Sequence, residues 1–491
     1  MIASDPTTYL LRLSGTVSTK SPTTRKRFVR RLETNLRDAL DRRGVDYELD
    51  RQWNRLFIHT PDPRAPELLA NVCGIQSVRP SHDADYESLD DLVRVGTELF
   101  ADRIDGRTFG VKARRVGQRD QFSFDSMDVH EALGGALDEA GGTVDLDDPE
   151  VRVRLEVHGD RVYFYDRDIP GPGGLPIGTQ SRALALVSGG FDSAVAAWLM
   201  LKRGIALDFV FFNLGGPAHL QGVHSVIGHL EQTWIHGHRA DLHIVDFRPL
   251  LAELKADVAG KYWQVVLKRL MFRAADQIAD QEDYPALVSG EAIGQVSSQT
   301  LGNLAAIQAP IRTPLFRPLA GYNKEDIIAL AREIDVHDRA EQVPEFCALQ
   351  GGKPVTNTNP TRLDNQEANL DLSLIETLVD DRRIEELREL TTEETDLDVQ
   401  IDHLPSEAAL LDVRSEAKYE DWHADDAMHV PFVTALEQYP MLPDQPTWVL
   451  YCEVGLKSAL IAEKMRQAGF QAYSFDGGVP KLKRWLERQH R

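Results

Sequence analysis

The feature that most restricts the fold of this 491-residue sequence is an apolar run, ALALV at 183–187, followed directly by SGGFDS at 188–193. The run has the length and composition of a strand buried on both faces, and residues 194–203, which end before Gly204, have the pattern of a helix. A glycine turn between such a strand and a helix is also an anion site. Glycine allows close backbone approach, and the first helical N–H groups point at the ligand.

The region at 179–349 continues this alternation of strand and helix. Strands are predicted at 183–187, 206–212, 241–246 and 286–289, and helices include 263–279 and 324–334. Such alternation predicts a doubly wound parallel sheet with helices on both faces, whose ligands bind beyond the carboxyl ends of the strands. SGGFDS lies at one such end, and Gly290-Glu291 lies at another.

The chemistry of the SGGFDS turn differs from that of the usual phosphate loop. A loop of the form GxxxxGK[ST] places a lysine on the terminal phosphates, whereas this turn lacks the lysine and has Asp192 near its place. Ser188 and Ser193 add hydroxyl donors. The motif resembles the PP-loop of ATP pyrophosphatases, which adenylate a carbonyl or carboxylate oxygen and release pyrophosphate. For these six residues alone, a glycine turn without a ligand is the alternative.

Charge is unevenly distributed along the chain. The formal net charge of −22 argues against indiscriminate nucleic-acid binding, but basic residues cluster in the front half and acidic residues at 380–402. This asymmetry predicts a front half that binds a polyanion, with a solvated basic face as the alternative. The candidate contacts are Arg25, Lys26, Arg27, Lys112, Arg114 and Arg115.

The front half is predicted to form two domains. Residues 1–63 contain a strand, an arginine-rich helix at 24–43 and two further strands, a pattern typical of a ferredoxin-like α+β domain. Residues 64–168 contain GRTFGVKARRVG and VRVRLEVHGDRVYFY, which resemble the THUMP domain of tRNA-modifying enzymes. Basic strands of this kind would position phosphates without reading sequence. A glycine- and proline-rich linker follows at 169–178.

The last domain is predicted at 401–491, after an acidic connector at 350–400 that includes a helix at 373–390. A DVR strand end at 412–414 and a CEVGLKS loop at 452–458 resemble a rhodanese domain, which is an α/β fold. A cysteine faced by loop amides beside a helix N-terminus is favoured as a thiolate and can hold a persulfide anion. Cys452 is therefore the candidate sulfur carrier, and a structural cysteine is the alternative.

Other residues have simpler interpretations. Cys73 lies in the apolar VCGI segment and is predicted to fill core space. The histidines between 219 and 243 fit no zinc spacing and have no cysteine among them, so we expect surface histidines and no metal site. No apolar run approaches the roughly 20 residues of a membrane span, and residues 1–20 lack a secretory core, which favours a cytoplasmic protein without membrane partners.

A resemblance to one family extends over nearly the whole chain. The blocks that carry it are SGGFDS, FFNLGGPAH at 211–219, VVLKRLMFRAA at 265–275, SGEAIGQVSSQT at 289–300, RPLAGYNKEDII at 317–328 and PEFC at 344–347. They resemble the tRNA 4-thiouridine synthetase family, which implies a multidomain protein with ferredoxin-like, THUMP, PP-loop and rhodanese parts. The implied ATP site includes Leu186, Val187, Ser188, Gly189, Gly190, Ser193, Lys268, Gly290 and Gln299.

The resemblance also implies a mechanism. ATP with Mg²⁺ adenylates the 4-oxygen of the uridine at position 8 of tRNA. Asp192 is expected to help place Mg²⁺ or the counter-ion of pyrophosphate, and a helix-capping carboxylate is the alternative. Sulfur comes from a Cys452 persulfide loaded by a cysteine desulfurase. Cys347 resolves the intermediate as a disulfide with Cys452, which a cellular thiol reductant reopens. A second implied role is sulfur supply for the thiazole ring of thiamine, through a thiazole sulfur-carrier protein.

Two other functions stay open at the level of the sequence. One is a sulfur donor that serves only thiazole formation, which would leave the basic front half without a purpose. The other is a noncatalytic tRNA-binding protein with a degenerate loop. The intact SGGFDS motif and the presence of Cys347 and Cys452 argue against the second.

Overall fold

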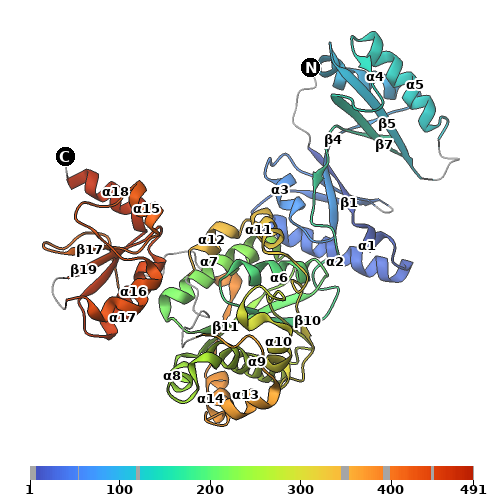
Figure 1. Ribbon diagram of the computed structural model, residues 1–491. Helices are drawn as coiled ribbons and strands as arrows, with labels where there is room; N and C mark the ends of the chain where they lie inside the picture. The colour runs from blue at the N-terminus through green and yellow to red at the C-terminus, as the bar shows by residue number, and fades with distance from the viewer. Residues whose placement is uncertain are drawn as a thin grey trace. The chain divides into compact units, whose positions relative to one another are not determined.

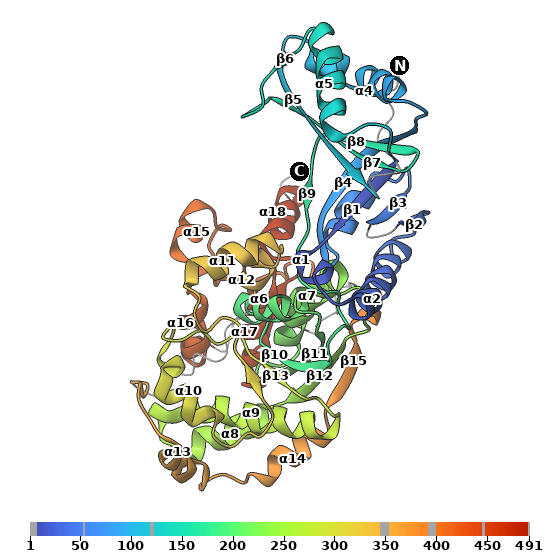
Figure 2. The ribbon, with the colours of Figure 1, turned by 90° about the vertical axis from the view of Figure 1, so that its right-hand side faces the viewer.

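The computed structural model of the chain describes residues 7–52, 55–117, 122–343, 353–390, 399–443 and 447–489 (Figures 1 and 2). The chain forms two compact units. The first unit holds Met1–Thr179 with the short segments Lys202–Gly204 and His236–His238, and the second unit holds the rest. Within the described ranges, no helix is both long enough and apolar enough to cross a membrane.

A βαββαβ arrangement opens the first unit. Its elements are β1 (Thr8–Leu13), α1 (Gly15–Ser18), α2 (Pro22–Asp41), β2 (Glu48–Gln52), β3 (Arg55–His59), α3 (Ala65–Ala70) and β4 (Ile75–Asp85). The strands lie in the ferredoxin-like order β2-β3-β1-β4. Helix α2 packs on the sheet through Leu32, Leu36 and Leu40, which recur every four residues and therefore share one face.

Strand β4 continues from this sheet into a second one. Residues up to Ser81 pair with β1, and residues from His82 onward pair with β8. The second sheet and its helices are α4 (Leu89–Ile104), β5 (Thr108–Val116), α5 (Ser126–Glu139), β6 (Thr143–Val144), β7 (Val151–His158) and β8 (Arg161–Tyr165), and β9 (Ile169–Pro170) returns to pair with β4. Helices α4 and α5 bury Leu92 and Leu133 in its core. The shared strand makes the two sheets parts of one compact unit.

A buried ionic cluster also joins the two sheets. The Glu156 carboxylate on β7 accepts hydrogen bonds from Arg55 Nε of β3 at 3.1 Å and from Arg79 Nη1 of β4 at 2.8 Å, and it lies 3.2 Å from His158 Nε2. Burial alone would raise the pKa of Glu156, but the hydrogen bonds from His158 and Arg55 and the charges of Arg55 and Arg79 lower it to about 2. Glu156 therefore stays ionised where the two sheets meet.

A mostly parallel sheet forms the centre of the second unit. Its strands are β10 (Arg182–Val187), β11 (Ala206–Asn213), β12 (Asp241–Asp246), β13 (Leu287–Val288), β14 (Leu315–Phe316) and β15 (Arg383–Glu386), in the order β14-β13-β10-β11-β12-β15. One face is covered by α6 (Phe191–Leu201), α7 (Pro217–Trp234), α11 (Lys324–Glu333) and α12 (His337–Glu341) (Figure 1). The other face is covered by α8 (Arg248–Asp257), α9 (Trp263–Gln281), α10 (Leu301–Gln308), α13 (Pro360–Glu367) and α14 (Ser373–Asp380) (Figure 1).

The predicted solvated connector is wrong for residues 353–390. Helices α13 and α14 pack on α9, and they bury Leu363 and Val379 in the main core of this sheet. The prediction failed because part of the acidic charge of this segment is neutralised by ion pairs inside the protein. Glu367 of α13 is 3% exposed and pairs with Arg269 at 3.3 Å and with Arg273 at 2.9 Å, both from α9. Residues 391–398 of the predicted connector lie outside the described part of the chain.

The predicted helix at 373–390 is wrong beyond its first half. Helix α14 ends at Asp380, and Arg383–Glu386 forms β15, which pairs antiparallel with β12. The register joins Ile384 to His243. This segment forms a strand because it pairs with the exposed edge of β12, and an unpaired strand edge readily accepts another strand.

A second parallel sheet forms the C-terminal part of the second unit. Its strands are β16 (Gln400–Ile401), β17 (Ala409–Asp412), β18 (Met428–His429), β19 (Trp448–Tyr451) and β20 (Ala472–Phe475), in the order β16-β20-β19-β17-β18. Its helices are α15 (Glu416–Asp421), α16 (Phe432–Gln438), α17 (Leu456–Gln467) and α18 (Gly478–Gln489). Apolar clusters lie on both faces, one with α16 and α17 and one with α18. The domain boundaries drawn from the sequence, at 63, 168, 178, 349 and 400, stay predictions.

Substitution of Glu156 by Gln should destabilise the first unit by about 3 kcal/mol, because Arg55 and Arg79 would lose a buried partner. The pKa of Glu156 lies below its ordinary value. Its contribution to the free energy of unfolding is therefore complete above about pH 4.5 and is lost as the pH falls toward 2. Calorimetric unfolding of the full chain at several pH values measures both effects. The control is Glu98→Gln, an exposed partner of Arg94, which should change stability by less than about 1 kcal/mol. Equal effects of the two variants would contradict the expectation.

Candidate functional site

The central sheet of the second unit has a topological switch point beside β10. From β10 the chain passes to β11 on one side, whereas β13 lies on the other side of β10. Loops that leave neighbouring parallel strands in opposite directions open a crevice at the carboxyl ends of those strands. The SGGFDS turn follows β10, and Gly290-Glu291 follows β13. The two motifs therefore meet at the edge where a parallel sheet binds ligands, as the sequence predicts.

The SGGFDS turn is held in shape by its own residues. Gly189 has a φ of +79°, which favours glycine, and α6 begins two residues later. Ser193 Oγ donates to the carbonyl of Gly190 at 2.8 Å and accepts from the N–H of Ser188 at 3.4 Å. The Ser193 hydroxyl thus fixes the turn that presents the N-terminus of α6, an anion-binding position.

The second loop touches this turn directly. A Cβ added at Gly290 would lie 2.7 Å from the backbone N of Ser193 and 2.8 Å from the carbonyl carbon of Asp192. Real Cβ atoms do not approach other atoms so closely, so position 290 has no room for a side chain. This close approach is the reason why glycine is needed after β13. Leu186 and Val187, which end β10, complete the same edge.

Asp192 is paired with a lysine from another element. Lys324 Nζ, at the start of α11, lies 3.1 Å from both carboxylate oxygens of Asp192 and 4.1 Å from the centre of the Phe191 ring. Gln295 Nε2 donates to Asp192 at 2.9 Å. Lys324 supplies the positive charge that the turn itself lacks. Sequence reasoning assigned it no role, although it lies in the RPLAGYNKEDII block.

Lys268 is held by an acidic residue that follows β13. Its Nζ lies 3.4 Å from Glu291 Oε1, and Arg317 Nε donates to Glu291 Oε2 at 2.8 Å. Glu291 is buried. Gln299 lies on the same loop as Gln295, which contacts Asp192. The structure thus brings Lys268, Gln299 and the SGGFDS turn to one edge, whereas the roles of Glu291 and Arg317 were not recognised from the sequence.

The rhodanese-like sheet presents Cys452 at the end of β19. The N–H of Gly455 donates to Cys452 Sγ at 3.2 Å, and Ser458 Oγ donates to it at 3.4 Å. Gly455 has a φ of +93°, and α17 begins at the next residue, so the loop turns the Gly455 amide toward the sulfur. Cys452 itself is 1% exposed. Two hydrogen-bond donors therefore lie against the Cys452 sulfur.

The DVR strand end supports the cysteine loop from the neighbouring strand. The N–H of Val413 donates to the carbonyl of Tyr451 at 3.1 Å, next to Cys452. Arg414 and Asp412 form a buried pair in which Nη2 donates to Oδ2 at 2.6 Å and Nε to Oδ1 at 3.0 Å. A fork-to-fork pair of this kind fixes both side chains. It orders the end of β17, the strand that pairs with β19 beside Cys452.

The chain matches family models along its length. The "ThiI ferredoxin-like domain" matches residues 8–78, the "THUMP domain" 86–166, the "Thiamine biosynthesis protein (ThiI)" 178–372 and the "Rhodanese-like domain" 395–484. A protein of Desulfurococcus amylolyticus described as a tRNA sulfurtransferase is 34% identical to this chain over 485 residues, which cover 98% of this chain and 99% of that protein. The chain belongs to the tRNA sulfurtransferase family.

Other members of the tRNA sulfurtransferase family and a solved structure agree with this assignment. The protein of Aeromonas hydrophila is 34% identical, with 94% of this chain and 98% of that protein covered. A crystal structure described as a 4-thiouridine synthetase–RNA complex with bound ATP superposes with a TM-score of 0.67 at 28% identity, and the match covers 77% of this chain and 98% of that chain. The family and the fold class predicted from the sequence are confirmed.

The basic residues predicted to contact tRNA lie on two elements of the first unit. Lys26 and Arg27 are exposed in the first turns of α2. Lys112 and Arg114 are exposed on β5, where they alternate with less exposed residues. Beside them lies a polar hollow of about 290 Å³ lined by Ala113, Arg114, Arg115, Gly117, Phe122 and Ser126.

Arg115 differs from its two exposed neighbours. It donates to the carbonyl of Phe124, and its guanidinium lies 5.4 Å from the centre of the Phe122 ring. Arg25 is also partly covered. Both are therefore weaker candidates for phosphate contacts than Lys112 and Arg114, and all contacts with tRNA stay predictions.

The two cysteines in the described part of the chain have different surroundings. Cys73 is 1% exposed in the first unit, and burial raises the pKa of its thiol to about 12, so its prediction as core filler is confirmed. Cys452 has donors on its sulfur. Cys347, the predicted resolving residue, lies outside the described residues.

The prediction of surface histidines is wrong for several positions. His219, His236 and His243 are buried. The His219 ring lies edge-on to Phe211 at 4.7 Å, and burial lowers its pKa to about 4 despite a hydrogen bond that involves the backbone of Ser188. A neutral His219 thus packs behind the SGGFDS turn. Histidine has an apolar ring that fills core space when it is uncharged, which the spacing of histidines in sequence does not show.

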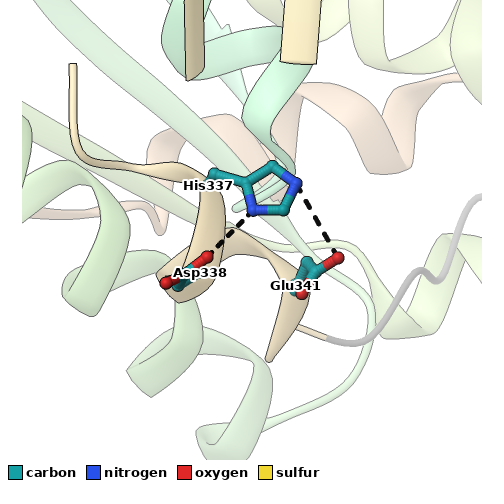
Figure 3. Close-up of side chains that lie close together, drawn as sticks. All are labelled: His337, Asp338 and Glu341. Atoms are coloured by element: carbon teal, nitrogen blue, oxygen red, sulfur yellow. Dashed lines mark hydrogen bonds and ion pairs between the residues drawn. The ribbon is translucent and has the colours of Figure 1, made fainter. Parts of the chain in front are cut away.

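A group of possible metal ligands lies on α12 (Figure 3). His337 Nδ1 lies 3.0 Å from Asp338 and Nε2 lies 3.8 Å from Glu341. Both carboxylates are exposed, and all three residues come from one short helix. The His337 ring also lies 5.7 Å from the Phe191 ring of the SGGFDS turn. Packing behind the turn explains the position of His337, and we assign no ion to the group.

Substitution of Gly290 by Ala should weaken ATP binding while the chain still folds. The added Cβ would force the β13 loop away from Ser193, at a free-energy cost of about 1–3 kcal/mol. If this cost applies to the ATP-bound state, the affinity for ATP should fall roughly 5- to 150-fold. Titration with ATP measures the change. The control is Gly321→Ala, where an added Cβ would have nothing within 4 Å. Unchanged ATP affinity in Gly290→Ala would show that the close contact does not shape the site.

Proposed function

We propose that this chain uses ATP to adenylate a uridine of tRNA, at position 8, and replaces its 4-oxygen with sulfur carried by Cys452 to give 4-thiouridine. The observation that supports this most is the presence in one chain of two anion-stabilising sites of different kinds. One is the SGGFDS turn at the switch point, closed by Gly290. The other is the Cys452 loop, whose amide and hydroxyl face sulfur. Family membership supports the combination.

In the adenylation step, the SGGFDS turn would hold the phosphates of ATP. The positive φ of Gly189 and the side-chain-free contact at Gly290 leave room for backbone approach, so the residues fit a nucleotide. The backbone of Leu186 and Val187 would hold adenine, with Lys268 and Gln299 as further contacts. The uridine 4-oxygen attacks the α-phosphorus, the bond to the bridging oxygen breaks and pyrophosphate leaves. A known 4-thiouridine synthetase structure with bound ATP supports this use of the fold.

Asp192 and Lys324 would serve the leaving pyrophosphate. Mg²⁺ bound with ATP would neutralise charge on the phosphates, and Asp192 is the carboxylate that we assign to it. Lys324 lies 3.1 Å from both oxygens of Asp192. It keeps Asp192 oriented, and its charge would offset the charge that develops on pyrophosphate.

In the sulfur step, the terminal sulfur of a Cys452 persulfide would attack C4 of the activated uridine and expel AMP. The thiolate of Cys347 then attacks the Cys452 sulfur. A Cys347–Cys452 disulfide forms, the bond between Cys452 and the transferred sulfur breaks, and the sulfur stays on C4. A cellular thiol reductant supplies two electrons to reopen the disulfide. In the other order, Cys347 attacks first and releases sulfide, which then reacts at C4.

The partners follow from these steps. A cysteine desulfurase would load Cys452, and the basic surfaces of the first unit would bind tRNA. The reaction would take place in the cytoplasm. A second function is sulfur supply for the thiazole ring of thiamine, through a thiazole sulfur-carrier protein. It is favoured by the match of residues 178–372 to a family described as a thiamine biosynthesis protein.

Unmodified tRNA incubated with the protein, ATP, cysteine and a desulfurase should contain 4-thiouridine, measured by mass spectrometry of nucleosides. Cys452→Ala should abolish the product because the sulfur carrier is lost, and Cys347→Ala should abolish turnover. Cys73→Ala is the matched control, since this thiol is buried in the first unit and inert. If the parent consumes ATP to AMP but makes no thiouridine, the acceptor is not tRNA and the thiazole function takes precedence.

Replacement of Lys112 and Arg114 by Gln should weaken tRNA binding and its dependence on salt. Each lost phosphate contact lowers the slope of log affinity against log salt concentration by about 0.9. The slope of the double variant should therefore be smaller by about two. Binding to unmodified tRNA at several salt concentrations measures the slope. Arg94→Gln is the control in the same domain, because Arg94 is already paired with Asp91 and Glu98. An unchanged slope in the double variant would place the tRNA surface elsewhere.

A further inference from the structure

A buried carboxylate beside the switch point gathers several donors. Glu291 accepts from Ser289 Oγ at 3.3 Å and from Arg317 Nε at 2.8 Å, and it lies 3.4 Å from Lys268 Nζ. Its side chain is 7% exposed, and those of Lys268 and Arg317 are 17% and 14% exposed. The family resemblance assigns an ATP contact to Lys268, but it assigns no role to Glu291 or to Arg317.

The charges of this group do not balance among its own members. One carboxylate faces two cations, which leaves one excess positive charge in a largely buried place. Arg317 Nη1 donates to Gln308 Oε1 at 2.6 Å, which is neutral. Arg317 Nη2 is buried and has no hydrogen-bond partner among the described residues. A buried cation with an unused donor is costly unless an anion completes its surroundings.

The position of Arg317 in the fold places it at the ligand edge of the sheet. It follows directly after β14, whose Phe316 carbonyl accepts from the N–H of Ser289 at 3.0 Å. Ser289 in turn precedes Gly290, which touches the Ser193 amide of the SGGFDS turn. A continuous set of backbone contacts therefore connects Arg317 to the anion-binding turn.

We propose that Arg317 is a phosphate-binding residue of the ATP site and that Glu291 is a positioning residue, which holds Lys268 and Arg317 ready for the phosphates. Arg317 Nη2 lacks a partner among the described residues, and a polyphosphate would supply an acceptor for it and balance the excess positive charge. A guanidinium fork suits this task because it forms two parallel hydrogen bonds with a phosphate. This inference rests on the proposed use of ATP.

A purely structural role for the Arg317–Glu291 pair would give different experimental results. An Arg317–Glu291 pair that only joined the ends of β13 and β14 would affect stability, and it would leave the affinity of the folded protein for nucleotides unchanged. Ligand affinity measured as a function of phosphate number therefore separates the two roles.

The first experiment measures binding of ATP and of AMP to the full chain without tRNA. Arg317→Gln should weaken ATP binding about 10- to 100-fold, the scale of one or two charged hydrogen bonds, and should change AMP binding less than threefold. Arg317→Lys, which keeps the charge but not the fork, should recover part of the loss. Arg312→Gln is the matched control. This arginine is exposed and precedes the same strand, at the opposite end of β14, so ATP affinity should stay within twofold of the parent.

The second experiment tests Glu291 by comparing binding with rate. Glu291→Gln keeps the shape but removes the negative charge that holds Lys268 and Arg317, so ATP affinity should fall. The rate of pyrophosphate release with tRNA should fall at least tenfold, because Lys268 and Arg317 are no longer held in position. Glu291→Asp, which retains the charge, should recover part of the rate.

The outcomes distinguish this inference from the proposed function. If the parent binds no ATP, the proposed function itself fails. If the parent binds ATP and folded Arg317→Gln binds it within twofold as well, only the phosphate role of Arg317 is overturned. Equal losses for ATP and AMP would show a general disturbance of the pocket and would also overturn it. If folded Glu291→Gln binds ATP and releases pyrophosphate within twofold of the parent, the positioning role of Glu291 is overturned.

Discussion

The site in the second unit depends on one backbone contact, where Gly290 of the β13 loop lies against the Ser193 amide at the start of α6. A Cβ at position 290 would lie 2.7 Å from that nitrogen. Because the two loops touch, the N-terminus of α6 faces the crevice beside β10 and β13, and Glu291 is directed to Lys268 and Arg317. Without the contact the same residues would be present, but the strand ends would not form a single site.

Positive charge reaches this crevice from several elements. The usual phosphate loop carries its lysine within the loop, whereas here Asp192 lies near that place and Lys324 arrives from α11. Lys268 comes from α9 and Arg317 from the end of β14. Cations that are distributed in this way are each held by a carboxylate, which keeps them ordered and limits the cost of burying them.

Two cysteines of the chain show how surroundings decide reactivity. Cys73 and Cys452 are equally buried, at 1% exposure. Cys73 lies in an apolar core, where burial raises its pKa to about 12. Cys452 receives donors from Gly455 and Ser458 at the start of α17, and the Asp412–Arg414 pair supports the strand beside it. The protein therefore packs one thiol in an apolar core and places the other beside two hydrogen-bond donors.

The sequence by itself determined the α/β organisation, the family and the position of the SGGFDS turn at a strand end. These follow from local patterns, since hydrophobic period and glycine chemistry act within a few residues. Tertiary structure alone decided which distant groups meet. It paired Asp192 with Lys324, joined Glu291 to Arg317, buried His219 behind the turn, and turned Arg383–Glu386 into a strand on the edge of β12. Acidic residues at 353–390 looked solvated because their partners, Arg269 and Arg273, lie about 90 residues earlier. Pairings over such separations depend on the folded sheet, which no local pattern records.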